Sequence, residues 1–273
     1  MLKRKQLPVA LTIAGSDSGG GAGIQADLKT FASLGVHGAS VITCVTAQNP
    51  KSVRAIEPCG LGIVRGQLEA VFDELPPAAV KTGMLYSARI IRTVADFFRG
   101  CRRAPPLVVD PVMISTSGKR LLEPRAVSIL CGELLPLAAL VTPNLHEAEI
   151  LLGQKLISVE AMRDAAKELQ RRFGCSALVK GGHLRGLNEA VDIFYDGRQE
   201  LLLRAPFIRG LRAHGTGCVY SAAITAYLAR GLSLSQAVPP AKEYITQAIA
   251  RSERAGTHHV LNSFAGYEAW RTI

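Results

Sequence analysis

The chain has 273 residues, of which 48% are hydrophobic and 20% are charged, a composition typical of a globular α/β domain. Its six cysteines are scattered without a CxxC pair, which argues against a disulfide framework or a zinc site and is typical of reduced cytoplasmic thiols. The net charge of +10 comes from dispersed basic residues with few aromatics, which argues against nucleic-acid binding and favours a surface that attracts an anionic small molecule.

Short apolar runs alternate with helical patterns along the chain. The first run, 8–14, precedes Gly15-Ser16-Asp17 and is expected to be a strand rather than a signal peptide. The other expected strands are 39–46, 79–81, 107–110, 139–141 and 177–180, with a hairpin of 191–195 and 201–205 at the sheet edge. The expected helices are 23–34, 61–72, 88–98, 124–131, 146–152, 158–173 and 217–228, with one or two more in 234–254, which Pro239-Pro240 are expected to interrupt.

This alternation predicts one α/β domain over residues 1–273, built on a mostly parallel sheet with helices on both faces. Residues 1–6 form a basic tail and 256–273 a C-terminal tail, and no apolar run reaches the ~18 residues that a membrane span needs. Ligands bind beyond the carboxyl ends of such strands. Polar, glycine and proline residues follow each expected parallel strand: Gly15-Ser16-Asp17, Gln48-Asn49, Thr82-Gly83-Met84, Asp110-Pro111-Val112, Thr142-Pro143-Asn144 and Lys180-Gly181-Gly182.

The segment 15–23 is a glycine-rich loop between a strand and a helix. It fits neither the G-x-G-x-x-G dinucleotide pattern nor a Walker A loop, because no Gly-Lys-Ser/Thr follows. What remains is a backbone that can approach a ligand closely. Asp27, one turn into the helix, is either an acid that complements the helix dipole or a carboxylate that meets the ligand.

Three further positions suggest phosphate chemistry. Asp110 ends an apolar strand, where a carboxylate can bind a metal ion or a substrate hydroxyl. Asn144 and Glu147 are three residues apart at a helix start, a spacing that suits Mg²⁺ but equally forms a capping box. Lys180 ends an interior strand, where its charge is costly unless it meets an anion. Gln48 offers a carboxamide that can read the edge of a heterocycle.

The stretch His214-Gly215-Thr216-Gly217-Cys218 is a glycine turn that opens an apolar helix. Backbone N–H groups without helical partners at such a start form an anion site. The same position lowers the pKa of a thiol, so Cys218 is a candidate base or nucleophile. Taken alone, the stretch is better explained as a turn before a core helix with a buried cysteine. Together with Lys180 and the carboxylates, it indicates phosphoryl transfer, in which cations neutralise charge and one group positions or deprotonates the acceptor hydroxyl.

The order of these motifs resembles the hydroxymethylpyrimidine/phosphomethylpyrimidine kinases of thiamine biosynthesis, in the ribokinase-like superfamily. The motifs that carry the resemblance are Leu11 to Asp17, Gly19 to Lys29, Thr46 to Asn49, Lys81 to Met84, Val109 to Met113, Thr142 to Glu147, Lys180 to His183 and His214 to Cys218. The resemblance implies a three-layer αβα sandwich. It also implies ATP- and Mg²⁺-dependent phosphorylation of 4-amino-5-hydroxymethyl-2-methylpyrimidine, and then of its monophosphate, by a cytoplasmic homodimer without nucleic-acid or membrane partners.

The resemblance also implies a role for each matching residue. Substrate would contact Gly15, Asp27, Gln48, Met84 and Val112; Asn144, Lys180, Gly215, Thr216 and Gly217 would bind ATP and phosphate; Asp110 and Glu147 would serve the metal; Cys218 and Lys180 would be catalytic. Many members of the superfamily have an aspartate base where this chain has Cys218. A thiolate there serves as the base, or the thiol only orients the hydroxyl.

Three segments depart from the family pattern. The flap reads Ile114 to Gly118 instead of Ala-Lys-Ser-Gly, with Lys119 as the candidate substitute for the missing lysine. Residues 211–213 replace the usual Asn-Thr before His214, and 257–260 lack a glycine-rich ending. One rival is a pyridoxal kinase on the same scaffold, whose dual-cysteine form carries a flap cysteine where this chain has Ser115. Another is a non-catalytic pyrimidine-binding regulator, which the retained Lys180 and Cys218 disfavour.

Overall fold

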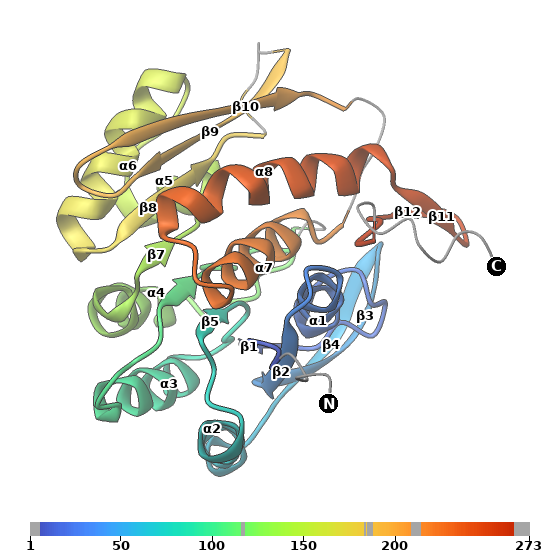
Figure 1. The fold of residues 1–273 in the computed structure, drawn as a ribbon, viewed down its shortest axis with the longest axis vertical. Coiled ribbons are helices and arrows are strands. Elements are labelled where there is room, and N and C mark those ends of the chain that lie inside the picture. Colours follow the sequence, from blue (N-terminus) through green and yellow to red (C-terminus); the bar gives the residue numbers. More distant parts are fainter. Residues whose placement is uncertain (1–5, 116–117, 183, 185–187, 209–213, 265–273) are drawn as a thin grey trace, which may run out of the picture.

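The computed structural model describes residues 6–115, 118–182, 184, 188–208 and 214–264. An eight-stranded sheet in the order β10-β9-β8-β7-β6-β5-β1-β2 lies at its centre (Figure 1). Its parallel strands are β1 (Val9–Ala14), β2 (His37–Ile42), β5 (Ala79–Thr82), β6 (Leu107–Val109), β7 (Leu140–Val141) and β8 (Ser176–Lys180). The hairpin of β9 (Glu189–Tyr195) and β10 (Glu200–Pro206) runs antiparallel at one edge, as the sequence predicts.

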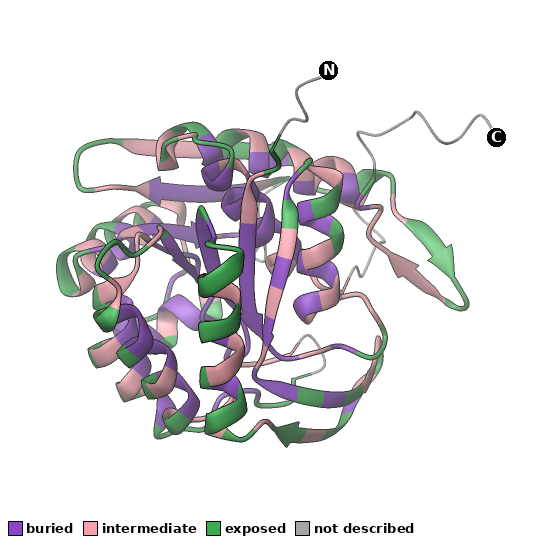
Figure 2. Ribbon diagram, turned by 60° about the horizontal axis from the view of Figure 1, so that its bottom comes forward, coloured by how far each residue is buried: buried purple, intermediate pink, exposed green. Residues whose placement is uncertain are grey.

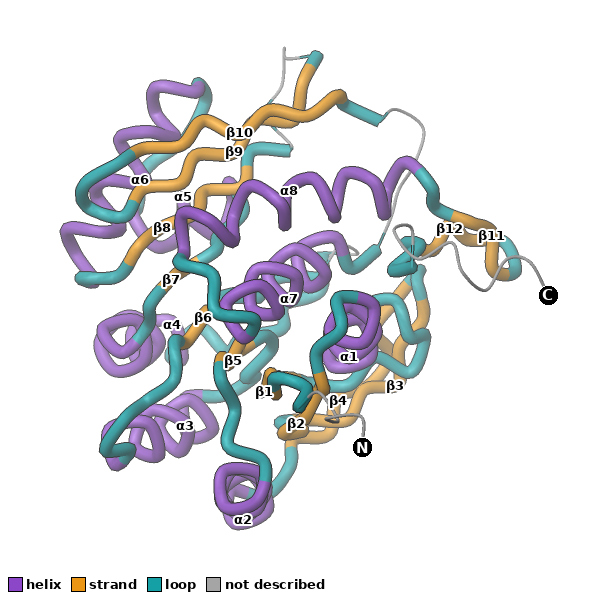
Figure 3. Tube along the Cα trace, in the orientation of Figure 1, coloured by secondary structure: helices purple, strands orange, loops and turns teal. Residues whose placement is uncertain are grey.

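Helices cover both faces of this sheet, so the expected three-layer αβα architecture is confirmed (Figure 3). One face packs against α1 (Gly23–Ser33), α7 (Thr216–Ala229) and α8 (Leu234–Ala250). The other packs against α2 (Leu61–Glu74), α3 (Ala88–Gly100), α4 (Ala126–Ile129), α5 (Leu145–Leu152) and α6 (Val159–Phe173). Each face therefore has its own apolar core, and the strands contribute side chains alternately to the two.

The central strands of the sheet are buried (Figure 2), and α7 is buried from Val219 to Ala229 except at Tyr227. Strands covered on both faces read as continuous apolar runs, which explains why short runs alone marked them in the sequence. Helix α7 is apolar around its whole circumference, and Ala222, Ala223 and Ala226 are fully buried. A helix without a polar face has to lie inside the protein. Its first turn is thereby fixed at the carboxyl edge of the sheet.

The strand expected at 39–46 is wrong as one element. Strand β2 ends at Ile42, and β3 (Cys44–Asn49) pairs with β4 (Ser52–Pro58) in a separate two-stranded sheet that the sequence analysis missed. The separation occurs at Thr43, whose N–H donates to the Ala14 carbonyl while its Oγ1 donates to the Met84 carbonyl. Bound on two sides, Thr43 turns the chain out of the main sheet.

The expected break at Pro239-Pro240 is also wrong, because α8 runs through both prolines. The missing N–H groups leave the carbonyls of Ser235 and Gln236 without helical partners. Both residues keep solvent contact near the helix start, where water can hydrate these carbonyls. A capping box between Ser233 and Gln236 stabilises that start.

Two other regions differ from expectation. The helix expected at 124–131 is four residues of α4 followed by π- and 3₁₀-helical turns to Leu137. Residues within the expected last helix and C-terminal tail form a small hairpin, β11 (Glu253–Ala255) with β12 (His258–Val260). Residues 1–5 and 265–273 of the two predicted tails lie outside the described residues. In the described part of the chain, no helix combines the length and apolarity needed to cross a membrane.

Candidate functional site

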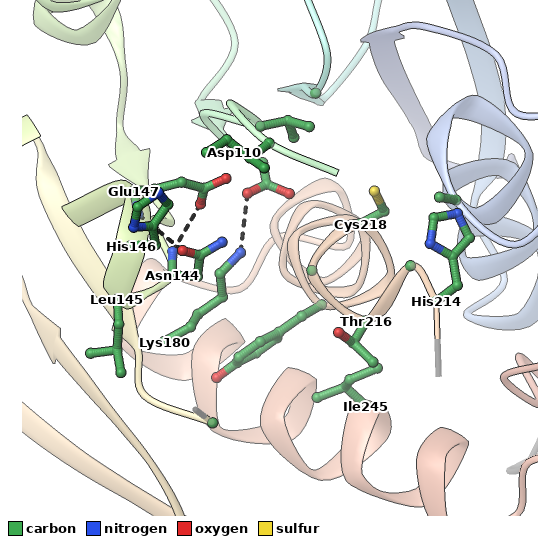
Figure 4. Close-up of a pocket in the computed structure, with 18 of the residues that line it drawn as sticks. Asp110, Asn144, Leu145, His146, Glu147, Lys180, His214, Thr216, Cys218 and Ile245 are labelled. Atoms are coloured by element: carbon green, nitrogen blue, oxygen red, sulfur yellow. Dashed lines mark hydrogen bonds and ion pairs between the residues drawn. The ribbon is translucent and has the colours of Figure 1, made fainter. Parts of the chain in front are cut away.

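A cavity of about 1280 Å³ lies along the carboxyl ends of the parallel strands (Figure 4). Of the predicted site residues, all but one line it: Gly15, Gln48, Met84, Asp110, Val112, Asn144, Glu147, Lys180, Gly215, Thr216, Gly217 and Cys218. The exception is Asp27. The cavity has two ends, which meet where Lys180 and Asp110 face the start of α7.

One end of the cavity lies beneath the β3–β4 hairpin. Gln48 belongs to β3 and not to the end of a main-sheet strand, which corrects its predicted location. Its Nε2 lies 3.0 Å from Nε2 of His214, which in turn lies 3.3 Å from Oδ2 of Asp17. The hairpin is thereby joined to the loop after β1 and to the turn before α7. Met84, Val112 and Leu121 line this end with apolar surface.

Asp17 organises the glycine-rich loop. Its carboxylate accepts hydrogen bonds from the N–H groups of Gly19, Gly21 and Ala22. Burial raises the pKa of Asp17, but its contact with His214 and these backbone donors outweigh burial and hold the pKa below the usual value. The loop is therefore wound around a buried carboxylate, a pattern that the glycine count alone did not reveal.

Asp27 lies in a closed ion pair behind the cavity. The Lys81 Nζ is 2.9 Å from both of its carboxylate oxygens, and Thr12 Oγ1 donates at 2.6 Å. Asp27 is in the second turn of α1, so a first-turn role at the helix dipole is wrong. Burial lowers the pKa of Lys81, but Asp27 outweighs it and keeps the pKa above the usual value. Lys81, which lines the cavity, was missed as a functional candidate.

Lys180 and Asp110 form the junction of the two ends. Lys180 Nζ lies 3.1 Å from Asp110 Oδ1, while Ser221 Oγ donates to Asp110 Oδ2 at 3.2 Å. Burial lowers the pKa of Lys180, but Asp110 and Glu147 together raise it above the usual value. A charged ammonium therefore sits between two carboxylates, in the place predicted for a phosphate contact.

The Asn144–Glu147 pair forms the capping box that was one of its two predicted roles. Asn144 Oδ1 accepts from the Glu147 N–H at 3.0 Å, and Glu147 Oε2 accepts from the Asn144 N–H at 2.9 Å. Glu147 Oε1 also accepts from the N–H of Met113 at 3.3 Å, which ties the segment after β6 to α5. Burial, reinforced by Asp110, raises the pKa of Glu147 despite the opposing charge of Lys180.

The carboxylates fit a water-rich Mg²⁺ site and not a cage of protein ligands. Within the described residues, no cluster of three or more His, Cys, Asp or Glu side chains could hold a metal. Asp110 and Glu147 each keep lone pairs beyond the donors they accept from, and both line the cavity. Magnesium in kinase sites is bound by one or two carboxylates together with substrate phosphates and water. These two residues suit that mode.

The start of α7 is shaped by close backbone approach. Gly215, with φ of +84°, is the N-cap residue and makes no side-chain capping bond. A Cβ on Gly215 would lie 1.8 Å from the carbonyl oxygen of Gly21, and one on Gly217 would lie 3.2 Å from Lys180 Nζ. Position 215 therefore requires glycine, whereas a Cβ at position 217 would only press against the flexible end of the Lys180 side chain. The uncapped helix start faces the cavity at the Lys180 end, as predicted for an anion site.

The expectation that the helix start lowers the pKa of Cys218 is wrong. Burial raises the pKa of this thiol to about 12; the Lys81 ammonium opposes the rise, whereas Asp27 and Asp110 add to it. The helix start alone could not reveal this, because burial, the largest cause, depends on the packing of α7, and the two carboxylates come from distant segments. Cys218 is therefore a neutral thiol in the free protein.

The opposite end of the cavity is apolar at its mouth. Ile157 is 83% exposed and Phe207 46%, although both line the cavity. Ile245 of α8 also lines the cavity and lies beside Thr216 (Figure 4). Deeper in, Lys242 Nζ lies 2.7 Å from Asp192 Oδ2. Exposed apolar side chains at a cavity mouth are typical of a surface that a flat ligand covers. These residues lie outside the strand-end pattern, so no motif in the sequence indicated them.

The structure describes Lys119 and Ser115, two residues singled out where the flap departs from the family pattern. Lys119 does not face the phosphate region: its Nζ donates to the backbone carbonyls of Val53 at 2.7 Å and Arg54 at 3.4 Å. Ser115 lines the cavity. Residues 116–117, 183 and 211–213, which were also singled out in the sequence, lie outside the described residues.

Comparison with known proteins gives consistent matches. The sequence model of the phosphomethylpyrimidine kinase family matches residues 17–262. A hydroxymethylpyrimidine/phosphomethylpyrimidine kinase of Rhizobium meliloti is 51% identical over 90% of this chain and 92% of its own. A phosphomethylpyrimidine kinase structure from Clostridium difficile is 46% identical, with a TM-score of 0.78 over 89% of this chain and 99% of that one. The ADP complex of Bacillus subtilis pyridoxal kinase is 37% identical, with a TM-score of 0.88 over 96% and 99%.

Proposed function

The chain belongs to the phosphomethylpyrimidine kinase family, and on this premise we propose that it phosphorylates 4-amino-5-hydroxymethyl-2-methylpyrimidine, and then the monophosphate, in thiamine biosynthesis. The observation that carries the proposal is the two-ended cavity with Lys180 and the uncapped start of α7 at its junction. A phosphoryl group in transfer needs cationic and N–H donors around it and an acceptor hydroxyl in line. The ADP complex of a solved relative supports a nucleotide as the donor.

The residues divide into three groups along the cavity. Gln48, with Gly15, Met84 and Val112, binds the pyrimidine, because an amide can pair with a ring nitrogen and an amino group. Asn144, Thr216 and the backbone of Gly215 and Gly217 bind the nucleotide phosphates, and Lys180 neutralises charge on the transferring group. Asp27 pairs with Lys81 and does not contact the substrate. We propose a cytoplasmic homodimer whose partners are small molecules alone.

Mg²⁺ bound by Asp110 and Glu147 would supply charge neutralisation at the nucleotide phosphates. Lys180 lies between the same two carboxylates, so its ammonium is held at the junction before substrate arrives. Cys218 is a neutral thiol, and Lys81 is the cation that favours its deprotonation. We therefore assign Cys218 primarily to orienting the acceptor hydroxyl, because a loose transition state asks little of a base.

A coupled nucleotide-consumption assay tests this function. The purified protein is given ATP with hydroxymethylpyrimidine, its monophosphate or pyridoxal. We expect turnover with the first two and a kcat/KM for pyridoxal lower by at least about tenfold, since Ser115 stands where dual-cysteine pyridoxal kinases have a flap cysteine. A preference for pyridoxal would assign the rival activity. Pyrimidine binding without turnover would favour the regulator.

A further inference from the structure

The strongest feature outside the roles assigned above is the contact between the flap and the β3–β4 hairpin. The flap, residues 112–115 with 118–122, leaves β6 at the junction of the cavity and returns as an antiparallel bridge between Ile114 and Arg120. The N–H of Ser115 donates to the Lys119 carbonyl at 2.8 Å, and the Lys119 N–H donates to Ser115 Oγ at 2.9 Å. The backbone of Lys119 is therefore fixed within the flap, while its side chain extends to the hairpin.

The Lys119 ammonium ends on the strand opposite Gln48. It donates to the carbonyl of Val53, and Val53 is the register partner of Gln48 across β3 and β4. The register shifts between Ala47 and Gln48, so Gln48 sits at a bulge. Bulges redirect a side chain and loosen the ladder around it. Lys119 therefore binds β4 directly opposite Gln48, at the point where the pairing of β3 with β4 is irregular.

The flap and the hairpin also share an apolar cluster. Leu121 of the flap packs with Val53, Cys44 and Met84, all buried, and Val112 packs against the same group. At the start of the flap, the N–H of Met113 donates a hydrogen bond to Glu147 Oε1. It therefore contacts the proposed metal carboxylate at one end and the backbone opposite Gln48 at the other.

We propose that Lys119 is a positioning residue for the pyrimidine: its ammonium ties the flap to β4 and holds Gln48 in the orientation that reads the ring. This inference rests on the proposed function. A charge-assisted hydrogen bond to a carbonyl is stronger than a neutral one. Gln48 is held from the other side by Ser18, which exchanges hydrogen bonds with its backbone. Loss of the Lys119 tether should therefore loosen Gln48 without releasing it.

The test compares Lys119→Met with Lys119→Arg and with Lys51→Met, which removes the same charge from the turn of the same hairpin. We expect Lys119→Met to raise KM for hydroxymethylpyrimidine about fivefold, while kcat and the KM for ATP stay within about twofold. Lys119→Arg should retain wild-type values, since a guanidinium also donates to two carbonyls. Lys51→Met should match the wild type, and Gln48→Ala should raise the pyrimidine KM more than Lys119→Met does.

A rise in the KM for ATP with an unchanged pyrimidine KM would overturn the proposal and assign Lys119 to phosphate. Equal kinetics for Lys119→Met and Lys51→Met would overturn it too. Hydrogen exchange of the free protein provides a readout independent of substrate: Lys119→Met should speed exchange in β3, β4 and the flap, with no change in α6. If the wild type does not turn over hydroxymethylpyrimidine, the proposed function fails, and unchanged exchange would then refute the tether separately.

Discussion

At the scale of single residues, the charge state of Cys218 decides which proton-transfer role is open to it. Its pKa of about 12 stands above the ordinary value of about 8.5, because burial and two carboxylates disfavour the thiolate. The protonated form is thus the resting form through the neutral range, and charge appears only as pH rises towards the folded pKa. A thiol that only orients the acceptor hydroxyl can stay protonated. A thiol that acts as a base has to be deprotonated first.

We expect iodoacetamide to alkylate Cys218 about 10³-fold more slowly at pH 8 in the folded protein than in urea, since the thiolate fraction differs by about that factor. Peptide mapping separates Cys218 from the other five thiols. The rate in the folded protein should keep rising beyond pH 10.

Cys218→Ala should lower kcat by no more than about 10²-fold, with little change in the KM for ATP. Fast alkylation at pH 8 would show a stabilised thiolate and favour the base role; wild-type turnover of Cys218→Ala would remove Cys218 from catalysis.

Residue types at strand ends were predictable, but their pairings were not. Asp110 and Lys180 were expected at one edge because parallel strands end together, and both line the cavity. Gly217 was expected there as part of a helix start that binds an anion, and it lines the same cavity. Lys81 was not recognised, because a lysine at a strand end gives no sign of which carboxylate will meet it. Its partner Asp27 comes from α1, 54 residues earlier in the sequence. Long-range ion pairs of this kind depend on the packing of whole elements.

At the scale of elements, the start of α7 is expected to tolerate no side chain at Gly215. Gly215→Ala places a Cβ against the Gly21 carbonyl in a left-handed conformation, so the glycine-rich loop has to move. We expect a loss of about 3 kcal/mol in the free energy of unfolding, from strain and overpacking together, and a kcat/KM lower by at least about tenfold. Urea unfolding and the coupled assay measure the two.

Gly231, just beyond the other end of α7, is the matched control for this prediction. Its φ is +92°, but a Cβ there would meet nothing within 4 Å. Gly231→Ala should therefore cost only the conformational strain, about 1 kcal/mol, with activity unchanged. Equal losses for the two variants would contradict the close approach of the two loops.

The elements that sequence reasoning located well are those with a strong period or a continuous apolar run. It failed at β2 and β3 because apolar residues continue through Thr43, and only hydrogen bonds to Ala14 and Met84 reveal the turn there. It failed at Pro239-Pro240 because the prediction considered only the two N–H groups that proline lacks. The carbonyls left without a helical partner are close to solvent near the helix start, so the helix continues. Local patterns carry no information on contacts of this range.

At the scale of the whole molecule, one sheet joins both ends of the cavity. The end beneath the β3–β4 hairpin is built on β1, β5 and that hairpin, and the apolar far end on β8, β9 and α8. Helix α7 packs beneath both, against β1, β5 and β6 and against α8. Because a single helix and a continuous sheet connect the two ends, neither can lose its packing without exposing the core of the other. This connectivity is the physical basis for expecting one folding unit over the described chain.

We therefore expect urea unfolding to follow a single transition, with far-UV and near-UV circular dichroism coinciding. ADP with Mg²⁺ at about 100 times its Kd should raise the free energy of unfolding by about 2.7 kcal/mol and shift the entire curve. Chelation of Mg²⁺ should reduce this shift if Asp110 and Glu147 bind the ion together with the phosphates. Two transitions, of which ADP moves only one, would show that the ends fold separately. An ADP shift that is indifferent to chelation would instead remove the metal from the nucleotide site and leave Lys180 as its principal counter-charge.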